Sequence, residues 1–311
     1  YFYRVYMLIK NAIILLLLLN LVGCGGGGGG VQPTIYPVVS LSTSHASVTE
    51  NSGTTVTLTV TASKISDEDI TVTLSTSGTA TDGTDYSAVN GSSLTITAGT
   101  TTATKTFTIT DNSIYEGNET VIVAISTVSG GSATENGTQI ETITITENES
   151  APVITLATST ASVAENSLAI GDLPNALFAI IATSSQVTNE DITVTLSTSG
   201  SATDGTDYTV ASGSSNNGNG SLGGQTITIS AGATTGTITG TPTDDSIYED
   251  DEVATIAISD VSGGGATESG TQSVSITITE NETAPTITLA TSTASVAENS
   301  GTTVTLTATA S

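Results

Sequence analysis

The amino-acid sequence predicts an all-β protein made of tandem antiparallel β-sandwiches. Three observations support this fold class. Thr, Val and Ile, whose branched side chains favour extended backbone, are among the most frequent of the 311 residues. Apolar and polar residues alternate in short runs separated by Gly, Asp and Asn, as in strands with one buried face. Long segments also recur along the chain, which is the signature of a repeat array.

The first 24 residues are typical of an export leader. An unbroken apolar run at 12–19 follows Arg4 and Lys10. A helix needs roughly 20 apolar residues to cross the ~30 Å hydrocarbon core, so this run suits a signal peptide better than a membrane span. Position 1 is Tyr, and Met7 begins a segment that is a complete leader by itself. We therefore expect the natural start at Met7.

The leader ends in LVGC at 21–24, which resembles the lipobox of bacterial lipoproteins. The resemblance implies that Cys24 carries a lipid, that the leader 1–24 is cut before it, and that the mature chain has a membrane as partner. Cys24 is the single cysteine, so no disulfide framework competes for it. The expected location is the surface of a bacterial cell envelope. It is the outer membrane if the cell is Gram-negative, because Gly25 rather than Asp follows the cysteine.

A glycine-rich tether is expected at 25–37, since residues 25–30 are all glycine. A phosphate-binding glycine loop is the alternative, but neither a strand before it nor a helix or Lys after it is predicted. The flexible part has an r.m.s. reach of roughly 17–20 Å from the ~5–6 Å × √n rule. The segment is best interpreted as a spacer.

Self-similarity predicts two repeats, at 38–150 and 151–283, and the truncated start of a third at 284–311. The recurring segments are 47–59 with 295–307, 67–86 with 189–208, 111–119 with 244–252, and 143–149 with 276–282. The spacing between matching residues grows along repeat 2, which places insertions near GDLPNALFAIIATSS and SGSSNNGNGSLGG. The third copy stops after its second expected strand.

Alternation places the strands within repeat 1. The runs are TTVTLTVTA (54–62), ITVTLST (70–76), SLTITA (93–98), TKTFTIT (104–110), TVIVAIS (120–126) and ETITIT (141–146). About seven short strands in such a length predict an antiparallel sandwich with its Thr faces outward. Aromatic residues make up 4% of the chain, so the cores should be aliphatic.

Charge excludes several functions. The net charge is −26, all 30 acids follow Cys24, and Lys64 and Lys105 are the only basic residues after it. Such a field repels nucleic acid and attracts cations. His45 is the only histidine and Trp is absent, so a His-based metal site, a catalytic triad or an aromatic sugar platform cannot be assembled. The chain by itself is therefore not expected to be an enzyme.

Acidic residues gather in four short segments per repeat, each at the end of a strand. Ca²⁺ takes 6–8 oxygen ligands from carboxylates, amides and carbonyls, and four converging loops can supply them. Acids gathered so closely repel one another unless a cation lies among them. The alternative is that each acid only solvates a turn. That interpretation is preferred for Asp82 and Asp204, which belong to Asp-Gly turns.

GTATDGTDY (78–86), followed about 25 residues later by DNSIYEGNE, resembles the Calx-β module of sodium–calcium exchangers and large bacterial surface proteins. The resemblance covers residues from about 38 to 311. It implies a seven-stranded, Ig-like, Greek-key-type sandwich with a calcium cluster at one end. The sequence departs from the family pattern at Asn112 and Ser113, which replace acids, and in TENE, which replaces a terminal Asp run.

The resemblance implies matching ligand sets in the two repeats. In repeat 1 the set is Glu50, Asp85, Asp111, Asn112, Glu116, Glu119, Glu147 and Glu149. In repeat 2 it is Glu165, Asp207, Asp244, Asp245, Glu249, Glu252, Glu280 and Glu282. Repeat 2 is expected to bind Ca²⁺ more tightly, because Asp245 replaces the neutral Asn112.

Together these features predict a calcium-binding stalk or adhesion segment held on the cell surface by lipid. Two alternatives stay open. One is a metal-independent spacer, and the other is a mount for an adhesive or catalytic head beyond Ser311. A surface protein or a glycan is the expected class of receptor, and no nucleic-acid partner is expected.

Overall fold

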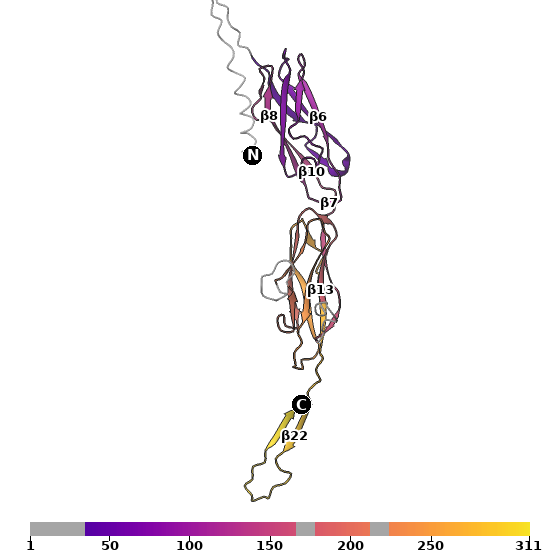
Figure 1. Cartoon of the computed structure of the whole chain (residues 1–311), viewed down its shortest axis with the longest axis vertical. Helices are drawn as coiled ribbons and strands as arrows, with labels where there is room; N and C mark the ends of the chain where they lie inside the picture. The colour runs from indigo at the N-terminus through magenta and orange to yellow at the C-terminus, as the bar shows by residue number, and fades with distance from the viewer. Residues whose placement is uncertain (1–34, 166–177, 212–223) are drawn as a thin grey trace, which may run out of the picture. The chain divides into compact units, whose positions relative to one another are not determined.

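A computed structural model describes residues 35–165, 178–211 and 224–311 (Figure 1). The predicted leader, Cys24 and most of the predicted tether lie outside these ranges. Parts of the two predicted insertions, at 166–177 and 212–223, also lie outside them. Within the described ranges, no helix is long and apolar enough to cross a membrane.

Repeat 1 is a two-layered β-sandwich. One sheet has the strand order β6-β3-β1-β9 and the other has the order β2-β10-β8-β4-β5. The strands are β1 (Val38–Thr43), β2 (Ser47–Thr49), β3 (Thr55–Ala62), β4 (Ile70–Gly78), β5 (Ser93–Ile96), β6 (Thr102–Thr108), β8 (Glu119–Ser129), β9 (Thr134–Glu135) and β10 (Ile140–Thr146). Each strand that alternation predicts is present with small shifts at its ends. Alternation does not predict β1, β2 or β9.

Repeat 2 has the same arrangement. Its sheets have the orders β16-β18-β13-β11-β20 and β12-β21-β19-β15-β17. The strands are β11 (Val153–Thr158), β12 (Ser162–Ala164), β13 (Phe178–Ser184), β15 (Ile192–Gly200), β16 (Tyr208–Ala211), β17 (Thr226–Ile229), β18 (Thr235–Pro242), β19 (Glu252–Ser262), β20 (Thr267–Glu268) and β21 (Ser273–Thr279). The predicted fold class, tandem antiparallel sandwiches, is confirmed.

Two further pairs of strands complete the topology. Strand β7 (Ile114–Tyr115) of repeat 1 pairs in parallel with β14 (Val187–Thr188) of repeat 2. After repeat 2, β22 (Ile287–Thr291) and β23 (Leu306–Ala310) form an antiparallel hairpin.

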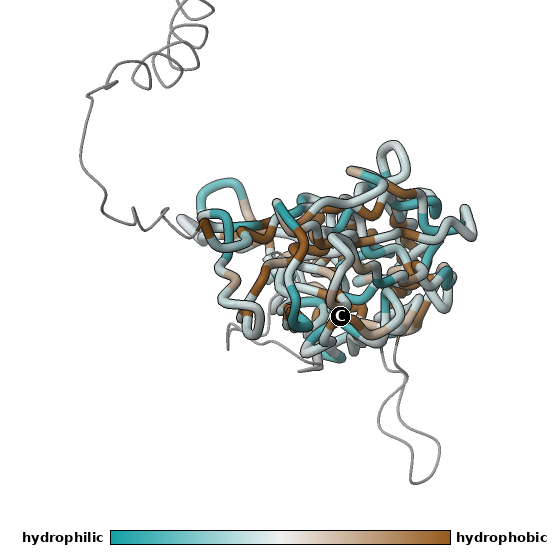
Figure 2. Tube along the Cα trace, turned by 90° about the horizontal axis from the view of Figure 1, so that it is seen from above, coloured by the Kyte–Doolittle hydropathy of each residue, from teal (hydrophilic) through white to brown (hydrophobic). Residues whose placement is uncertain are grey.

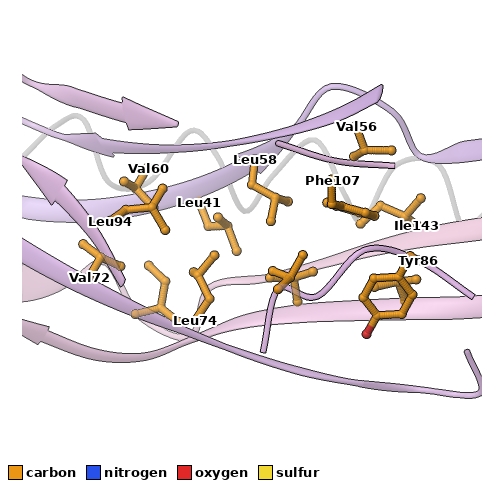
Figure 3. Close-up of a cluster of buried hydrophobic side chains, with 14 of the residues drawn as sticks. Leu41, Val56, Leu58, Val60, Val72, Leu74, Tyr86, Leu94, Phe107 and Ile143 are labelled. Carbon is orange, nitrogen blue, oxygen red and sulfur yellow. The ribbon is translucent and has the colours of Figure 1, made fainter. Parts of the chain in front are cut away.

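The core of repeat 1 follows from period-two alternation. On β3, Val56, Leu58 and Val60 are fully buried, whereas the intervening Thr side chains keep some exposure. Figure 3 shows these three side chains converging with Phe107 and Leu74 from other strands. Apolar and polar stretches are interspersed along the whole described trace (Figure 2). Burial of one strand face is therefore what joins the two sheets.

Each repeat has its own core. The buried apolar residues form one cluster drawn only from repeat 1 and a second drawn only from repeat 2. The two clusters share no member, so each sandwich buries its own apolar surface, as expected for independent modules rather than a solenoid.

Each core contains a Tyr–Phe pair, but the Phe of the pair lies on a different strand in each repeat. In repeat 1, Tyr86 packs edge-to-face on Phe107 of β6, with ring centroids 5.6 Å apart. In repeat 2, Tyr208 packs on Phe178 of β13 at 6.0 Å. Val56 of repeat 1 corresponds to Phe178 of repeat 2, and Phe107 corresponds to Gly240. Because Val56 lies opposite Phe107 and Phe178 lies opposite Gly240, the Phe residue is on β6 in repeat 1 and on β13 in repeat 2.

Candidate metal site

The loops that carry the predicted ligands meet at one end of each sandwich. In repeat 1, β4 ends at Gly78 beside the start of β8, where Gly78 pairs with Val121. Gly78 has φ +117, and a Cβ there would lie 2.1 Å from the Thr120 carbonyl oxygen. Only glycine fits this approach. The close contact brings the loop with Asp85 beside the loop that begins β8.

Asp85, Glu116 and Glu119 form the first acidic group of repeat 1. One carboxylate oxygen of each lies within 4.8 Å of the others. Asp85 is 5% exposed, and its Oδ2 accepts a hydrogen bond of 2.6 Å from the backbone N–H of Thr81. The Asp85 carboxylate also shares a hydrogen bond with the Glu119 side chain.

Glu50, Glu147 and Glu149 form the second group, also within 4.8 Å. Glu50 begins a 3₁₀ turn (Glu50–Ser52) after β2 and is 5% exposed. Glu147 Oε2 accepts hydrogen bonds from the backbone N–H groups of Glu116 (2.6 Å) and Gly117 (2.9 Å). Its Oε1 accepts them from Asn148 (2.9 Å) and Glu149 (3.0 Å). Glu147 therefore ties the loop before β8 to the end of β10.

Repeat 2 reproduces both groups and adds one. Asp207, Glu249 and Glu252 match the first group, and Glu165, Glu280 and Glu282 match the second. A third group of Glu165, Asp245 and Glu249 is formed among the described residues. It uses Asp245, at the position where repeat 1 has Asn112.

Burial and mutual repulsion raise the pKa of several of these acids. Burial, then the charges of Glu147 and Glu116, raise the pKa of Glu50 to about 7. Burial and the charge of Asp85 raise the pKa of Glu119 to about 7. In repeat 2, burial and a hydrogen bond with Asp207 raise the pKa of Glu252 to about 7. The folded protein thus holds carboxyl groups in places that disfavour their charge.

Glu147 and Glu280 behave in the opposite way. Burial acts to raise the pKa of Glu147, but its backbone hydrogen bonds outweigh burial and bring the pKa below its usual value. Hydrogen bonds from the backbone of Glu249 and Glu282 lower the pKa of Glu280 to about 2. These two carboxylates remain ionised and organise the loops.

A buried carboxylate oxygen at the same position of each repeat has no hydrogen-bond partner among the described residues. The atoms are Glu149 Oε2 and Glu282 Oε2, at equivalent positions. Burying an unpaired carboxylate oxygen is costly, so such an atom calls for a partner. Because Glu149 and Glu282 each belong to a group of three carboxylates, the partner that fits chemically is a hard cation bound by oxygen.

Three predicted ligands lie outside the acidic groups. The pKa of Glu149 is raised chiefly by a side-chain hydrogen bond with Glu147, and the charge of Asp111 adds to this. In repeat 2, a side-chain hydrogen bond with Glu280 chiefly raises the pKa of Glu282 to about 7, and the charge of Asp244 adds to this. Asn112 Oδ1 accepts a hydrogen bond of 2.6 Å from the Ile114 backbone N–H, and its Nδ2 donates to Glu116 Oε2 at 3.2 Å. Asn112 therefore positions Glu116 in this structure.

Three residues that contact the site were not predicted. Asn118 Oδ1 accepts a 3.0 Å hydrogen bond from the Glu147 backbone N–H, and Asp251 Oδ1 does the same for Glu280. From repeat 2, Asn189 Nδ2 donates to Glu116 Oε1 at 3.4 Å. The equivalence of Asn118 and Asp251 in the repeat alignment is a signal that could have drawn attention to this position.

The turn role predicted for Asp82 is confirmed. Its Oδ2 accepts hydrogen bonds from the backbone N–H groups of Val89 (3.1 Å) and Asn90 (2.7 Å) and from the Thr76 hydroxyl (3.2 Å). Burial opposes these bonds, but together they lower the pKa of Asp82. The Asp82 carboxylate therefore stabilises its own loop and is not a member of an acidic group.

The fold and its acidic loops define a class of protein, the tandem β-sandwich binding modules with a carboxylate cluster at one end of each module. The model of the Calx-β domain matches residues 33–149 and again 147–282. The chain therefore belongs to the Calx-β family.

Solved structures of this kind are also similar to the chain. CBD12 from CALX1.2 is 14% identical with a TM-score of 0.34, covering 78% of this chain and all of its own. The calcium binding domain CBD12 of CALX1.1 is 11% identical with a TM-score of 0.30, covering 75% and 96%. The apo form of the Calx CBD1 domain is 22% identical with a TM-score of 0.30, covering 36% and 98%. No curated protein matches the chain.

Proposed function

We infer that this chain is a calcium-binding stalk or adhesion segment of a bacterial cell surface, anchored by a lipid on Cys24. The observation that carries the calcium assignment is the unpaired buried oxygen of Glu149 and its counterpart in Glu282. Glu149 and Glu282 each belong to a group of three acids in which one oxygen of each residue lies within 4.8 Å of the others, and no acidic group of the described residues contains His or Cys. An all-oxygen set with flexible geometry favours Ca²⁺ over the softer transition metals.

A cation would relieve three costs at once. It would pair the unpaired oxygens, neutralise the repulsion among the acids, and offset the burial that raises the pKa of Glu50 and Glu119. Each acidic group joins loops that are far apart in sequence, as Glu50 and Glu147 show. Ion binding would therefore cross-link the end of each sandwich, which is the property a stalk requires.

Calcium binding is tested by thermal unfolding of a soluble form spanning residues 31–282. We expect Ca²⁺ to raise the unfolding midpoint relative to chelator, because a ligand of the folded state stabilises it by about 2.7 kcal/mol at a hundredfold excess over Kd. Mg²⁺ at matched ionic strength controls for general screening of the negative charge. Affinities of extracellular modules lie near ~10⁻⁴–10⁻³ M, so millimolar Ca²⁺ is needed.

Three variants sharpen this test. Glu149→Gln plus Glu282→Gln should abolish the Ca²⁺-specific shift, whereas Glu68→Gln, an exposed loop acid outside the acidic groups, should leave it unchanged. Asp244→Asn plus Asp245→Asn should weaken binding in repeat 2 alone. Equal shifts with Ca²⁺ and Mg²⁺ would instead support a metal-independent spacer.

The surface anchor rests on the leader and on LVGC at 21–24. We expect Cys24→Ser to abolish labelling by a fatty-acid analogue and to leave the protein uncleaved or released. The measurement is membrane fractionation of cells that express the full chain. A variant that partitions with membranes as fully as the parent would contradict the lipid anchor.

A further inference from the structure

A dipeptide of repeat 1 contacts repeat 2 directly. Ile114 pairs with Val187 and Tyr115 with Thr188 in the two-residue parallel bridge of β7 and β14. Ile114 and Tyr115 are half-buried, Val187 is half-buried and Thr188 is 1% exposed. The pairing thus combines backbone hydrogen bonding with apolar contact.

The Tyr115 ring lies over a glycine of repeat 2. A Cβ placed on Gly265 would lie 2.7 Å from Tyr115 Cε1 and 3.1 Å from its hydroxyl oxygen. The equivalent position in repeat 1 is Ser132, which has φ 51, close to the φ of 62 at Gly265. Since serine adopts this backbone conformation in repeat 1, the close approach of Tyr115, and not the turn, is what requires glycine in repeat 2.

Equivalent surfaces without such a partner are exposed. Ile247 and Tyr248, which match Ile114 and Tyr115, are 61% and 37% exposed. On the receiving side of the pairing, Val187 of repeat 2 corresponds to Ile65 of repeat 1. Ile65 is 61% exposed. The chain therefore presents one engaged dipeptide and one exposed dipeptide of identical sequence.

We propose that this Ile–Tyr dipeptide is a docking element for a Calx-β domain that carries glycine at the position of Gly265. Tyr115 engages repeat 2 in this way, and Ile247–Tyr248 presents the same element to a further Calx-β domain of that kind. A domain with serine there, such as repeat 1, is rejected because the side chain would occupy the place of the ring. The proposal does not depend on calcium binding.

The engaged pair is tested first in the full chain, in chelator. A photoreactive p-benzoylphenylalanine replaces Tyr115, and cross-links are mapped by mass spectrometry after cleavage at acidic residues, since only Lys64 and Lys105 follow the leader. We expect cross-links to 187–188 and 263–265. Cross-links confined to other segments would overturn the proposal.

A matched pair of glycine variants tests the role of Gly265. Gly265→Ser should remove the cross-link, whereas Gly270→Ser should retain it, because Gly270 has φ +68 and nothing within 4 Å of its added Cβ. Circular dichroism of both variants shows whether each sandwich remains folded. Equal cross-linking in folded Gly265→Ser would refute the steric argument.

The exposed element is tested with repeat 2 alone, residues 151–283, which has a core of its own. This fragment carries both an exposed Tyr248 and, without repeat 1, an uncovered Gly265. We expect head-to-tail association, seen as concentration-dependent NMR shifts of the 263–265 and 187–188 amides at millimolar concentration, where linked domains normally operate. Tyr248→Ala and Gly265→Ser should each abolish the shifts, and residues 38–150, with Ser132, should show none. Absence of shifts in the parent fragment would overturn the assignment of Ile247–Tyr248.

Discussion

Carboxylates in each acidic cluster divide into two kinds according to what surrounds them. Glu147 is held by four backbone N–H groups and is ionised throughout the working range of pH. Glu50 and Glu119 are buried among other acids and have pKa values near 7. The first kind builds the loops, and the second kind supplies charge only when a cation or a proton compensates it.

This division predicts a pH dependence of stability without metal. The folded pKa of about 7 for Glu50 and Glu119 lies above the ordinary value of 4.5, so the folded state binds more protons between those limits. In chelator, lowering the pH from 8 to 5 should therefore raise the thermal midpoint of residues 31–282. The low pKa of Glu147 acts below this window.

Variants and calcium provide the controls for the pH profile. Glu50→Gln plus Glu119→Gln should remove the part of the pH-dependent rise in thermal midpoint that comes from repeat 1. Glu68→Gln should leave that rise unchanged. Saturating Ca²⁺ should reduce or reverse the slope, because protons then compete with the ion for the same oxygens. A midpoint that falls steadily from pH 8 to 5 in chelator would show that these carboxyl groups are not buried as described.

Sequence reasoning located most residues of the candidate site but did not assign their roles. The resemblance to the Calx-β module placed Glu50, Asp85 and Glu116 in one ligand set, and the structure brings them to the same end of the sandwich. Nothing in the sequence distinguishes Glu147, which is saturated by backbone donors, from Glu149, which has an unpaired oxygen. That difference depends on where a loop 30 and 31 residues away in the sequence places its N–H groups.

At the scale of the strands, the two cores carry their Phe residue on different strands. Repeat 1 pairs Val56 of β3 with Phe107 of β6, and repeat 2 pairs Phe178 of β13 with Gly240 of β18. A Cβ on Gly240 would lie 2.2 Å from the Phe178 ring. The ring therefore occupies the volume that a side chain on β18 would need, so only a residue without a side chain fits opposite it.

A double-mutant cycle tests this exchange in residues 151–283. Phe178→Val should cost about 2–4 kcal/mol by leaving a cavity, and Gly240→Phe about 1–3 kcal/mol or more by overpacking. The double variant restores the arrangement of repeat 1 and should recover stability to within about 1–2 kcal/mol of the parent. Urea unfolding followed by circular dichroism measures each value. Additive losses would show that the two positions do not share one volume.

Alternation predicted the long strands because one face of each is buried in the core. It did not predict β1, whose run VVSLST is short and is paired in place by β3. Nor could it predict β7, a two-residue strand that exists only through its pairing with β14 of the next repeat. The alternation of apolar and polar residues indicates which strand faces are buried. The strands β1 and β7 depend instead on pairing with segments distant in sequence, which alternation does not show.

At the scale of the whole molecule, the repeat order predicted from sequence explains why identical segments have different environments. SGTTVTLT occurs at 52–59, where it enters β3, and again at 300–307, where it leads into β23. Val56 and Leu58 are fully buried, but the matching Val304 and Leu306 are 40% and 66% exposed. In repeat 1 a second sheet covers the strand that this octapeptide enters. In the hairpin of β22 and β23 no second sheet covers it.

This duplicated octapeptide predicts a large contrast in amide exchange within one chain. Equal sequences have nearly equal intrinsic exchange rates, so any difference measures the surrounding structure. A two-stranded hairpin is marginally stable in water, so 300–307 should exchange almost as fast as an unfolded peptide. The amides of 55–59, paired with β6 and covered by the opposite sheet, should be protected by several orders of magnitude. Hydrogen exchange read by NMR separates the two copies, and comparable protection of both would show that the hairpin face is covered and that the third repeat is wrongly bounded.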